Sequence, residues 1–276
     1  MVQNALPLTR LYFDENMVRG ESHAIASGIA VMYSARCPDR ETNEDAAALI
    51  PFTADSGILA VADGVGGNLA GHHAASLAIE ALKTSLADGV QDTLMLRTAI
   101  LNGVETANRT VQALGVGAAT TLALVELRGN TIRPYHVGDS MILVVGQRGR
   151  IKVQTTPHSP VGFAVEAGFL DETEAMHHKD RHLVSNVIGS IDMKIEVGST
   201  IRLAPRDTVL LASDGLFDNL AVEEIIERIR KGPIETIVER LATDATQRMI
   251  HPEDGQPSKP DDLTFSVFRL SASVSR

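Results

Sequence analysis

Three apolar segments of this chain, far apart in the sequence, each end in an aspartate that stands beside a glycine. Asp63 follows GILAVA, Asp139 follows HVG, and Asp214 follows VLLAS. Apolar runs of this kind are typical of buried strands, whereas an ionised carboxylate costs roughly 2–7 kcal/mol or more if it is buried without a partner. Because the arrangement occurs three times, it predicts that these strand ends meet at one place, where positive charge compensates the acids.

The composition is that of a globular protein with a sizeable core. The 276 residues are 44% apolar, which fits one large domain or two small ones. The net charge of −10 argues against a nucleic acid or an anionic membrane as the main partner, and it fits a cation site. Cys37 is the single cysteine, which excludes an intrachain disulfide and favours the reducing cytoplasm. The sequence MVQNALPLTRLYFDENMVRG lacks an apolar signal core, so we expect neither export nor a membrane span.

The first part of the chain changes from an irregular segment to strands. Residues 1–23 show no clear period, and we interpret them as an N-terminal extension or peripheral element. A single domain is then expected over residues 24–271. Its first strands are predicted at 25–35, 46–52 and 57–63, where short β-like runs are separated by turn residues.

Two helices are expected next, because apolar residues recur at intervals of three or four. The first should end at Asp88-Gly89, and the second should start near Asp92 or Thr93, which are good N-cap residues, and stop at Gly115. An antiparallel helix pair of this kind would cover one face of a sheet.

Strands return in the second half of the chain. Short turns join the segments 119–127, 131–137, 141–146 and 150–155, which predicts an antiparallel meander. Residues 156–190 are irregular, and we interpret them as a lid whose short helix is capped by Asp171 and Glu174. A further strand, two helices broken at Gly232-Pro233, and a strand over LTFSVFRL complete the pattern. Several connections are too short for the crossovers of a parallel sheet, so we expect an α+β fold of antiparallel sheets with helices outside.

Acidic residues gather at the strand ends and beside glycines. Without a counter-ion, each converging pair about 4 Å apart would repel by about 4 kcal/mol at an effective dielectric of 20. Oxygen ligands select hard cations such as Mg²⁺ or Mn²⁺. Gly64 and Gly215 each follow an aspartate and lack a Cβ, so their backbone could approach an ion. The acids in question are Glu44, Asp45, Asp63, Asp139, Asp214, Asp218, Asp261 and Asp262.

Six short motifs over residues 40–268 resemble the metal-dependent serine/threonine protein phosphatases of type 2C, in particular the bacterial branch. The motifs are RETNED, VADGVGG, ATT, HVGDS, LASDGLFD and PDDLTF, in this order. The resemblance implies a catalytic domain built as an α-β-β-α sandwich, with two antiparallel sheets and helix pairs on the outside. It also implies hydrolysis of phosphoserine and phosphothreonine in proteins. The implied cofactors are two Mn²⁺ or Mg²⁺ ions, with a third ion beside them.

The resemblance assigns the metal pair to matching residues. Asp63 would bridge two ions, the Gly64 carbonyl would bind one of them, and Asp214 and Asp261 would hold the other. Two ions roughly 3.5–4 Å apart lower the pKa of a bridging water and stabilise the attacking and leaving oxygens of an in-line displacement. The resemblance therefore implies attack by a bridging hydroxide without a covalent phosphoenzyme.

Other matching residues would support this reaction. Glu44 and Asp45 would act at or through metal-bound waters, and Asp139 would help Asp214 to hold the third, weaker ion. Arg40 would bind the substrate phosphate with its guanidinium fork. Animal members of the family have a histidine, proposed as the general acid, where this chain has Val65, so the proton donor is left open.

Alternatives remain open from the sequence. An aspartate before a glycine is most often a turn residue, GDS is typical of a hairpin turn, and Asp218 could cap the following helix. Arg40 could be a surface ion-pair residue. The chain could be a catalytically dead relative that binds phosphoproteins or a partner, or a hydrolase of a small phosphorylated metabolite. The preferred interpretation is a cytoplasmic, monomeric phosphatase whose substrate is a kinase or its target.

Overall fold

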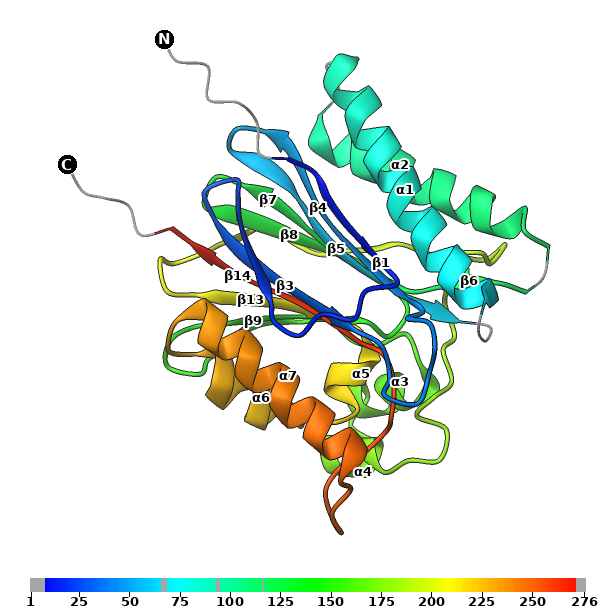
Figure 1. The fold of residues 1–276 in the computed structure, drawn as a ribbon. Helices are drawn as coiled ribbons and strands as arrows, with labels where there is room; N and C mark the ends of the chain where they lie inside the picture. Colours follow the sequence, from blue (N-terminus) through cyan, green and yellow to red (C-terminus); the bar gives the residue numbers. More distant parts are fainter. Residues whose placement is uncertain (1–7, 66–68, 93–94, 116, 272–276) are drawn as a thin grey trace.

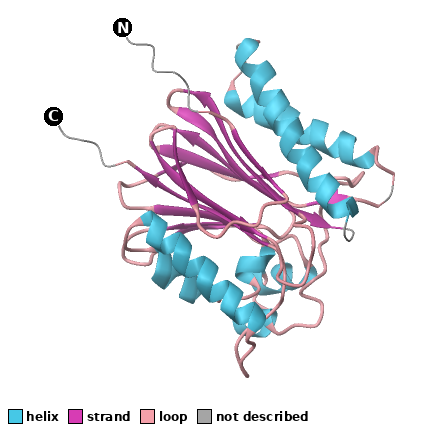
Figure 2. Ribbon diagram, viewed as in Figure 1, coloured by secondary structure: helices cyan, strands magenta, loops and turns pink. Residues whose placement is uncertain are grey.

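Two antiparallel sheets lie face to face between two pairs of helices in the computed structural model (Figure 1). The structure describes residues 8–65, 69–92, 95–115 and 117–271. Helices α1 and α2 cover the first sheet, and α6 and α7 cover the second, so the layers alternate as helix, sheet, sheet, helix (Figure 2). The predicted α-β-β-α sandwich is confirmed.

The first sheet follows the order β1-β4-β5-β7-β8-β11, with β6 beside β5 and β12 beside β8. Its strands are β1 (Arg10–Phe13), β4 (Asp45–Thr53), β5 (Ser56–Val65), β6 (Ala119–Thr120), β7 (Leu122–Arg128), β8 (Thr131–Val137), β11 (Glu196–Val197) and β12 (Ile201–Arg202).

The second sheet follows the order β10-β9-β13-β14-β3-β2. Its strands are β2 (Glu21–Ile25), β3 (Gly28–Ala35), β9 (Met141–Val145), β10 (Ile151–Gln154), β13 (Thr208–Ala212) and β14 (Leu263–Leu270). The helices are α1 (Leu69–Gln91), α2 (Leu96–Gln112), α3 (Pro160–Glu166), α4 (Glu172–Met176), α5 (Asp214–Phe217), α6 (Val222–Ile229) and α7 (Ile234–Ile250). None of these helices is long and apolar enough to cross a membrane.

Both faces of the central strands are buried, which explains why their sequences are continuously apolar. In β4, Ala48 and Ile50 pack under α1 and α2, whereas Ala47 and Leu49 face the second sheet. Successive side chains of a strand point to opposite faces, so one strand serves two core layers. The acids at the strand ends are therefore carried by a rigid frame.

The helix boundaries differ from the predicted ones. Helix α1 continues through Gly89 to Gln91, and α2 has Met95 at its N-cap instead of Asp92, without a side-chain cap hydrogen bond. Thr93, the other predicted cap, lies outside the described residues. Tertiary packing outweighs capping here, because the apolar stripe of α2 is buried against α1 and the first sheet.

The N-terminal segment contributes an edge strand to each sheet. Strand β1 pairs with β4, and β2 pairs with β3. The boundary expected at residue 24 falls inside β2. Short edge strands carry weak periodicity, since only one side of the strand is paired and much of it is exposed, and for this reason the sequence pattern did not indicate them.

The predicted meander is divided between the two sheets. Strands β7 and β8 pair in the first sheet, and β9 and β10 pair in the second. Gly138-Asp139-Ser140 therefore joins the sheets and is not a hairpin turn. Asp139 therefore lies where the chain passes from the first sheet to the second. We call the region between the two sheets at this end of their strands the seam.

The lid region contains two short helices near the same end of the sheets as α5 (Figure 1). In α4, Asp171 accepts a hydrogen bond from the Glu174 N–H, and Glu174 accepts one from the Asp171 N–H, which confirms the predicted cap. The described lid segment ends on the first sheet, where Thr120 and Ile188 exchange backbone hydrogen bonds.

Candidate active site

The acids of the two sheets meet across the seam of the sandwich. Asp45 and Asp63 are cross-strand partners at the ends of β4 and β5. Ser213, at the end of β13 in the second sheet, donates a hydrogen bond from Oγ to Oδ2 of Asp45 at 2.8 Å. One hydroxyl thus links the acids of both sheets.

Asp63 lies within electrostatic reach of acids from both sheets. Burial raises the pKa of Asp63 well above its ordinary value, and the charges of four other acids raise it further. These acids are Asp45, Asp214, Asp261 and Asp139. The predicted convergence of the strand-end aspartates is therefore observed.

Thr121, in the ATT motif, forms hydrogen bonds with residues of the VADGVGG and HVGDS motifs. The Asp63 N–H donates to Thr121 Oγ1 at 3.0 Å, and the Thr121 N–H donates to the Asp63 carbonyl at 2.8 Å. Thr121 Oγ1 also lies 2.6 Å from Ser140 Oγ. A Cβ on Gly138, which has φ +100°, would lie 2.6 Å from Thr121 Cβ. The sequence between Gly138 and Ser140 is thereby held against β5.

The glycines beside the aspartates are required by backbone contacts. A Cβ at Gly64 would lie 2.3 Å from the Gly71 carbonyl oxygen, and one at Gly215 would lie 1.9 Å from the Asp262 carbonyl oxygen. Gly71 in turn borders Glu44, because a Cβ there would be 3.2 Å from Oε2 of that acid. Any side chain at these positions would displace the backbone that carries the acids.

Arg40 lies at the rim of the acid group. Its Nη1 is 3.2 Å from Asp261 Oδ1, 3.4 Å from Asp262 Oδ2 and 3.9 Å from Glu44 Oε2, and its side chain is 39% exposed. Asp262 is almost fully buried and accepts the N–H groups of Cys37, at 2.7 Å, and Glu44, at 2.8 Å. Asp262 therefore fixes the loop before β4 onto the start of β14, a role that no sequence pattern indicated.

Lys259 reaches three of the acids, and the sequence analysis missed it. Its Nζ contacts Asp214, lies 2.9 Å from Asp218 and lies 3.2 Å from Asp261. Burial lowers the pKa of Lys259, but the three acids raise it more strongly, so it stays above the ordinary value. Its position two residues before Asp261 is the one signal that could have indicated it.

Asp218 and Asp139 border this group of acids. The alternative in which Asp218 caps the next helix is excluded, because α6 begins at Val222 with Ala221 at its N-cap, whereas Asp218 is the C-cap of α5. Burial, followed by the charge of Asp214, raises the pKa of Asp218 to about 6 and that of Asp139 to about 7. Acids with raised pKa values in a cleft are typical of functional sites.

A cavity of about 390 Å³ opens beside these acids and under the lid. Asp139, Asp214 and Asp218 are part of its lining. The remaining walls are largely apolar and include Met141, Val161, Val165, Met176, Phe217 and Val222. A group that enters the cavity thus meets these three acids, a largely apolar wall and the Arg181 side chain.

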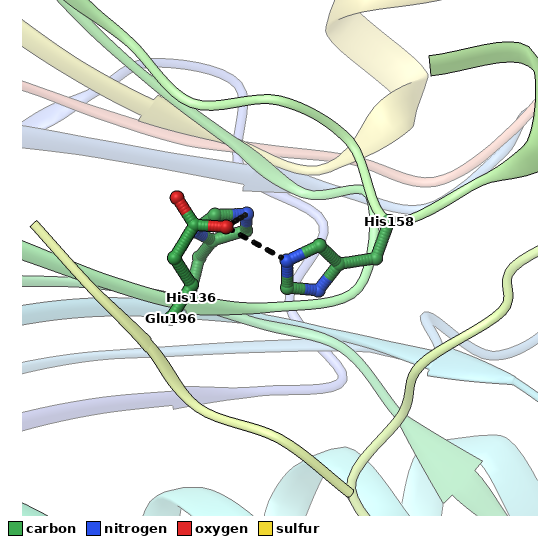
Figure 3. A group of neighbouring side chains, drawn as sticks. All are labelled: His136, His158 and Glu196. Atoms are coloured by element: carbon green, nitrogen blue, oxygen red, sulfur yellow. Dashed lines mark hydrogen bonds and ion pairs between the residues drawn. The ribbon is translucent and has the colours of Figure 1, made fainter. Parts of the chain in front are cut away.

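His136, His158 and Glu196 form a separate group of potential metal ligands (Figure 3). His158 Nε2 lies 3.3 Å from Glu196 Oε2, and the two imidazole rings stack with their centroids 4.2 Å apart. The Gly138 N–H donates to His158 Nδ1, and the Thr156 carbonyl accepts from His136 Nε2, so both Nε2 atoms carry protons. This pattern favours a structural tie between the lid and Gly138 over a metal site.

Residues 36–250 match the family model for protein phosphatase 2C. The chain belongs to the protein phosphatase 2C family. It is therefore a phosphoprotein phosphatase, and Asp45, Asp63, Asp139 and Asp214 lie in the matched part of the chain.

Relatives in bacteria agree with this membership. The protein phosphatase PhpP of Streptococcus pneumoniae is 31% identical over 175 residues, covering 61% of this chain and 70% of its own. The serine/threonine phosphatase stp of Listeria monocytogenes is 28% identical over 207 residues, covering 70% of this chain and 79% of its own.

Solved phosphatase structures share the fold. A serine/threonine phosphatase of S. agalactiae has a TM-score of 0.75 at 26% identity, covering 88% of this chain and 99% of its own. The catalytic domain of PstP, in complex with 2 manganese ions, has a TM-score of 0.67 at 25% identity, covering 88% of this chain and 98% of its own.

The protein phosphatase 2C family is metal-dependent, and the residues of this chain fit a hard cation. The donors that meet at the seam are carboxylate oxygens, the ligands that Mg²⁺ and Mn²⁺ prefer. Burial, followed by the charges of neighbouring acids, raises the pKa of Asp63 and of Asp139, and a divalent ion beside these carboxylates would lower both pKa values.

Proposed function

We propose that this phosphatase hydrolyses phosphoserine and phosphothreonine in proteins, with two Mn²⁺ or Mg²⁺ ions at the seam. Asp63, the Gly64 carbonyl, Asp214 and Asp261 would hold the pair. The observation that carries the proposal is the convergence of these acids from both sheets, together with the family match over residues 36–250. The relatives named serine/threonine phosphatases support the substrate class.

Two bound divalent ions lower the pKa of a coordinated water and stabilise charge on phosphate oxygens. The chain itself supplies orientation and charge. Arg40 is partly exposed at the rim, so its guanidinium can meet the phosphate there. Asp45 is held by Ser213 and lies beside Asp63, where its carboxylate can orient water, and Glu44 approaches from the start of β4.

The cavity beneath the lid is the proposed contact for the residues that flank the phosphorylated one. It is continuous with Asp139 and Asp214, and its walls are formed largely by apolar side chains. A protein segment would bury apolar area there, whereas a small phosphorylated metabolite would leave most of the cavity to water. This difference favours a protein substrate over a metabolite.

The decisive assay measures hydrolysis of p-nitrophenyl phosphate and of a phosphothreonine peptide, with Mn²⁺ and with chelator. We expect metal-dependent activity on both, and a loss of at least about 100-fold in Asp214→Asn. Asp88→Asn, an exposed acid of α1, is the matched control and should keep full activity. Turnover that persists in chelator would contradict the mechanism, and inactivity with every metal would favour the phosphoprotein-binding alternative.

The remaining parts of the proposal concern the setting of the enzyme. We infer a cytoplasmic monomer that opposes a kinase by acting on the kinase or its target. The single cysteine, Cys37, is buried and free, which suits a reducing compartment. Light scattering on the purified chain would test the monomer, because a stable dimer would double the measured mass.

A further inference from the structure

Lys259 is held in place by its backbone. Asn219 is fully buried, donates from Nδ2 to the Lys259 carbonyl at 2.8 Å and accepts the Lys259 N–H on Oδ1 at 2.8 Å. Asn219 also donates to the Gly215 carbonyl at 2.9 Å, in the turn of helix that begins with Asp214. The same buried amide thus positions the lysine and the segment that carries its main partner.

The ammonium of Lys259 lies where three carboxylates meet. It contacts Asp214, Asp218 and Asp261, and its side chain is 22% exposed. Without a cation, three carboxylates around one point would repel one another. Beside Asp214, Asp218 and Asp261, the ammonium of Lys259 supplies this positive charge.

We propose that Lys259 is a built-in counter-cation that takes the place of a further divalent ion beside Asp214 and Asp218. The proposal rests on the metal pair proposed above. Lys259 is a positioning residue: it holds the acids of α5 and β14 together when ions are absent. When the ion concentration is high enough to occupy both sites of the proposed metal pair, the chain then binds two ions. Lys259 takes the place of the third ion that was predicted beside Asp139 and Asp214.

The test counts Mn²⁺ ions bound to the full chain after metal removal, by isothermal calorimetry and by the electron paramagnetic resonance of free Mn²⁺. We expect two ions in the unaltered chain and in Lys259→Arg. Lys259→Met should bind one ion more, or bind Mn²⁺ at least about tenfold more tightly, because its acids have lost their cation. Lys152→Met is the matched control, since Lys152 pairs with Asp207 outside the site. An unchanged isotherm in Lys259→Met would overturn the proposal.

A second variant keeps the proposal testable if Lys259→Met does not fold. Asp218→Asn should leave the number of bound ions unchanged, because Lys259 and not an ion compensates this acid. Loss of one ion in Asp218→Asn would show that an ion binds there in the unaltered chain, and would overturn the proposal. These measurements require no turnover, so an inactive enzyme with the expected isotherms would refute the proposed function and leave the role of Lys259 intact.

Discussion

The negative charges on the two sides of the seam are compensated by different means. The acids of the second sheet have cations of the chain beside them, since Lys259 contacts Asp214 and Arg40 contacts Asp261. For Asp63, at the end of β5, the charged groups that dominate its surroundings are other acids. Divalent ions would therefore matter most for the first sheet, where they would balance the negative charge, whereas the second sheet is partly balanced by Lys259 and Arg40.

Replacement of the central acid of the first sheet should have the largest effect. Asp63→Asn should reduce turnover by about 1,000-fold or more, because it removes the proposed ligand shared by both ions. The same change should stabilise the metal-free chain by roughly 1–3 kcal/mol, since it removes a buried charge. Phosphatase assays and urea unfolding in chelator measure the two effects.

Asp55→Asn is the control for this pair of measurements, because Asp55 is exposed at the opposite end of β5. If the metal-free Asp63→Asn chain is less stable than the unaltered chain, the charge of Asp63 is compensated by other groups of the protein. This result would contradict the proposed difference in charge compensation between the two sides of the seam.

Stability of the metal-free chain should fall as pH rises from about 4 to about 7. Asp139 has a pKa of about 7 in the folded chain, against about 4 in an unfolded chain, so the folded state binds more protons between these values. The free energy of unfolding therefore decreases through this window, by roughly 2–4 kcal/mol. Asp218, with a pKa of about 6, acts in the same direction.

Urea unfolding in chelator at several pH values measures this decrease. Asp139→Asn should flatten the dependence, and saturating Mn²⁺ should reverse it, because ions bind the deprotonated acids. If the free energy of unfolding rises with pH over the same window, the raised pKa values of Asp139 and Asp218 do not determine the pH dependence.

On the rim of the second side, Arg40→Lys should lower kcat/KM by about tenfold, mainly through KM. Lysine keeps the charge beside Asp261 but cannot bind phosphate oxygens bidentately. Arg36→Lys is the matched control, because Arg36 lies in the same loop and donates to the Glu41 carbonyl. If the two variants have the same kcat/KM, Arg40 forms ion pairs with the acids and does not bind the phosphate.

The smallest effect should come from the hydroxyl that links the two sides. Ser213→Ala removes the hydrogen bond to Asp45 and should cost about 1–2 kcal/mol of stability. Ser76→Ala is the control, because the buried Ser76 Oγ has no hydrogen-bond partner among the described residues. Thermal unfolding compares the two, and equal melting temperatures would show that the link contributes nothing.

The sequence predicted the features that repeat and missed those that depend on tertiary contacts. Apolar runs ending in Asp63, Asp139 and Asp214 were sufficient to predict the convergence, because buried strands of a sandwich end at common edges. The crossing at Asp139 was mistaken for a hairpin turn, since local sequence does not say which sheet the next strand joins. The roles of Lys259 and Asp262 escaped prediction because most of their partners lie 40 or more residues away, such as Asn219 for the lysine.

The pairing of β3 with β14 joins residues 28–35 to residues 263–270. A ribosome releases the chain from its N-terminus, so β3 emerges long before the strand that will lie beside it. Asp262, which pins the loop before β4, emerges equally late. Nascent or prematurely terminated polypeptides therefore lack a finished catalytic centre, and dephosphorylation begins only after translation has passed the region of β14.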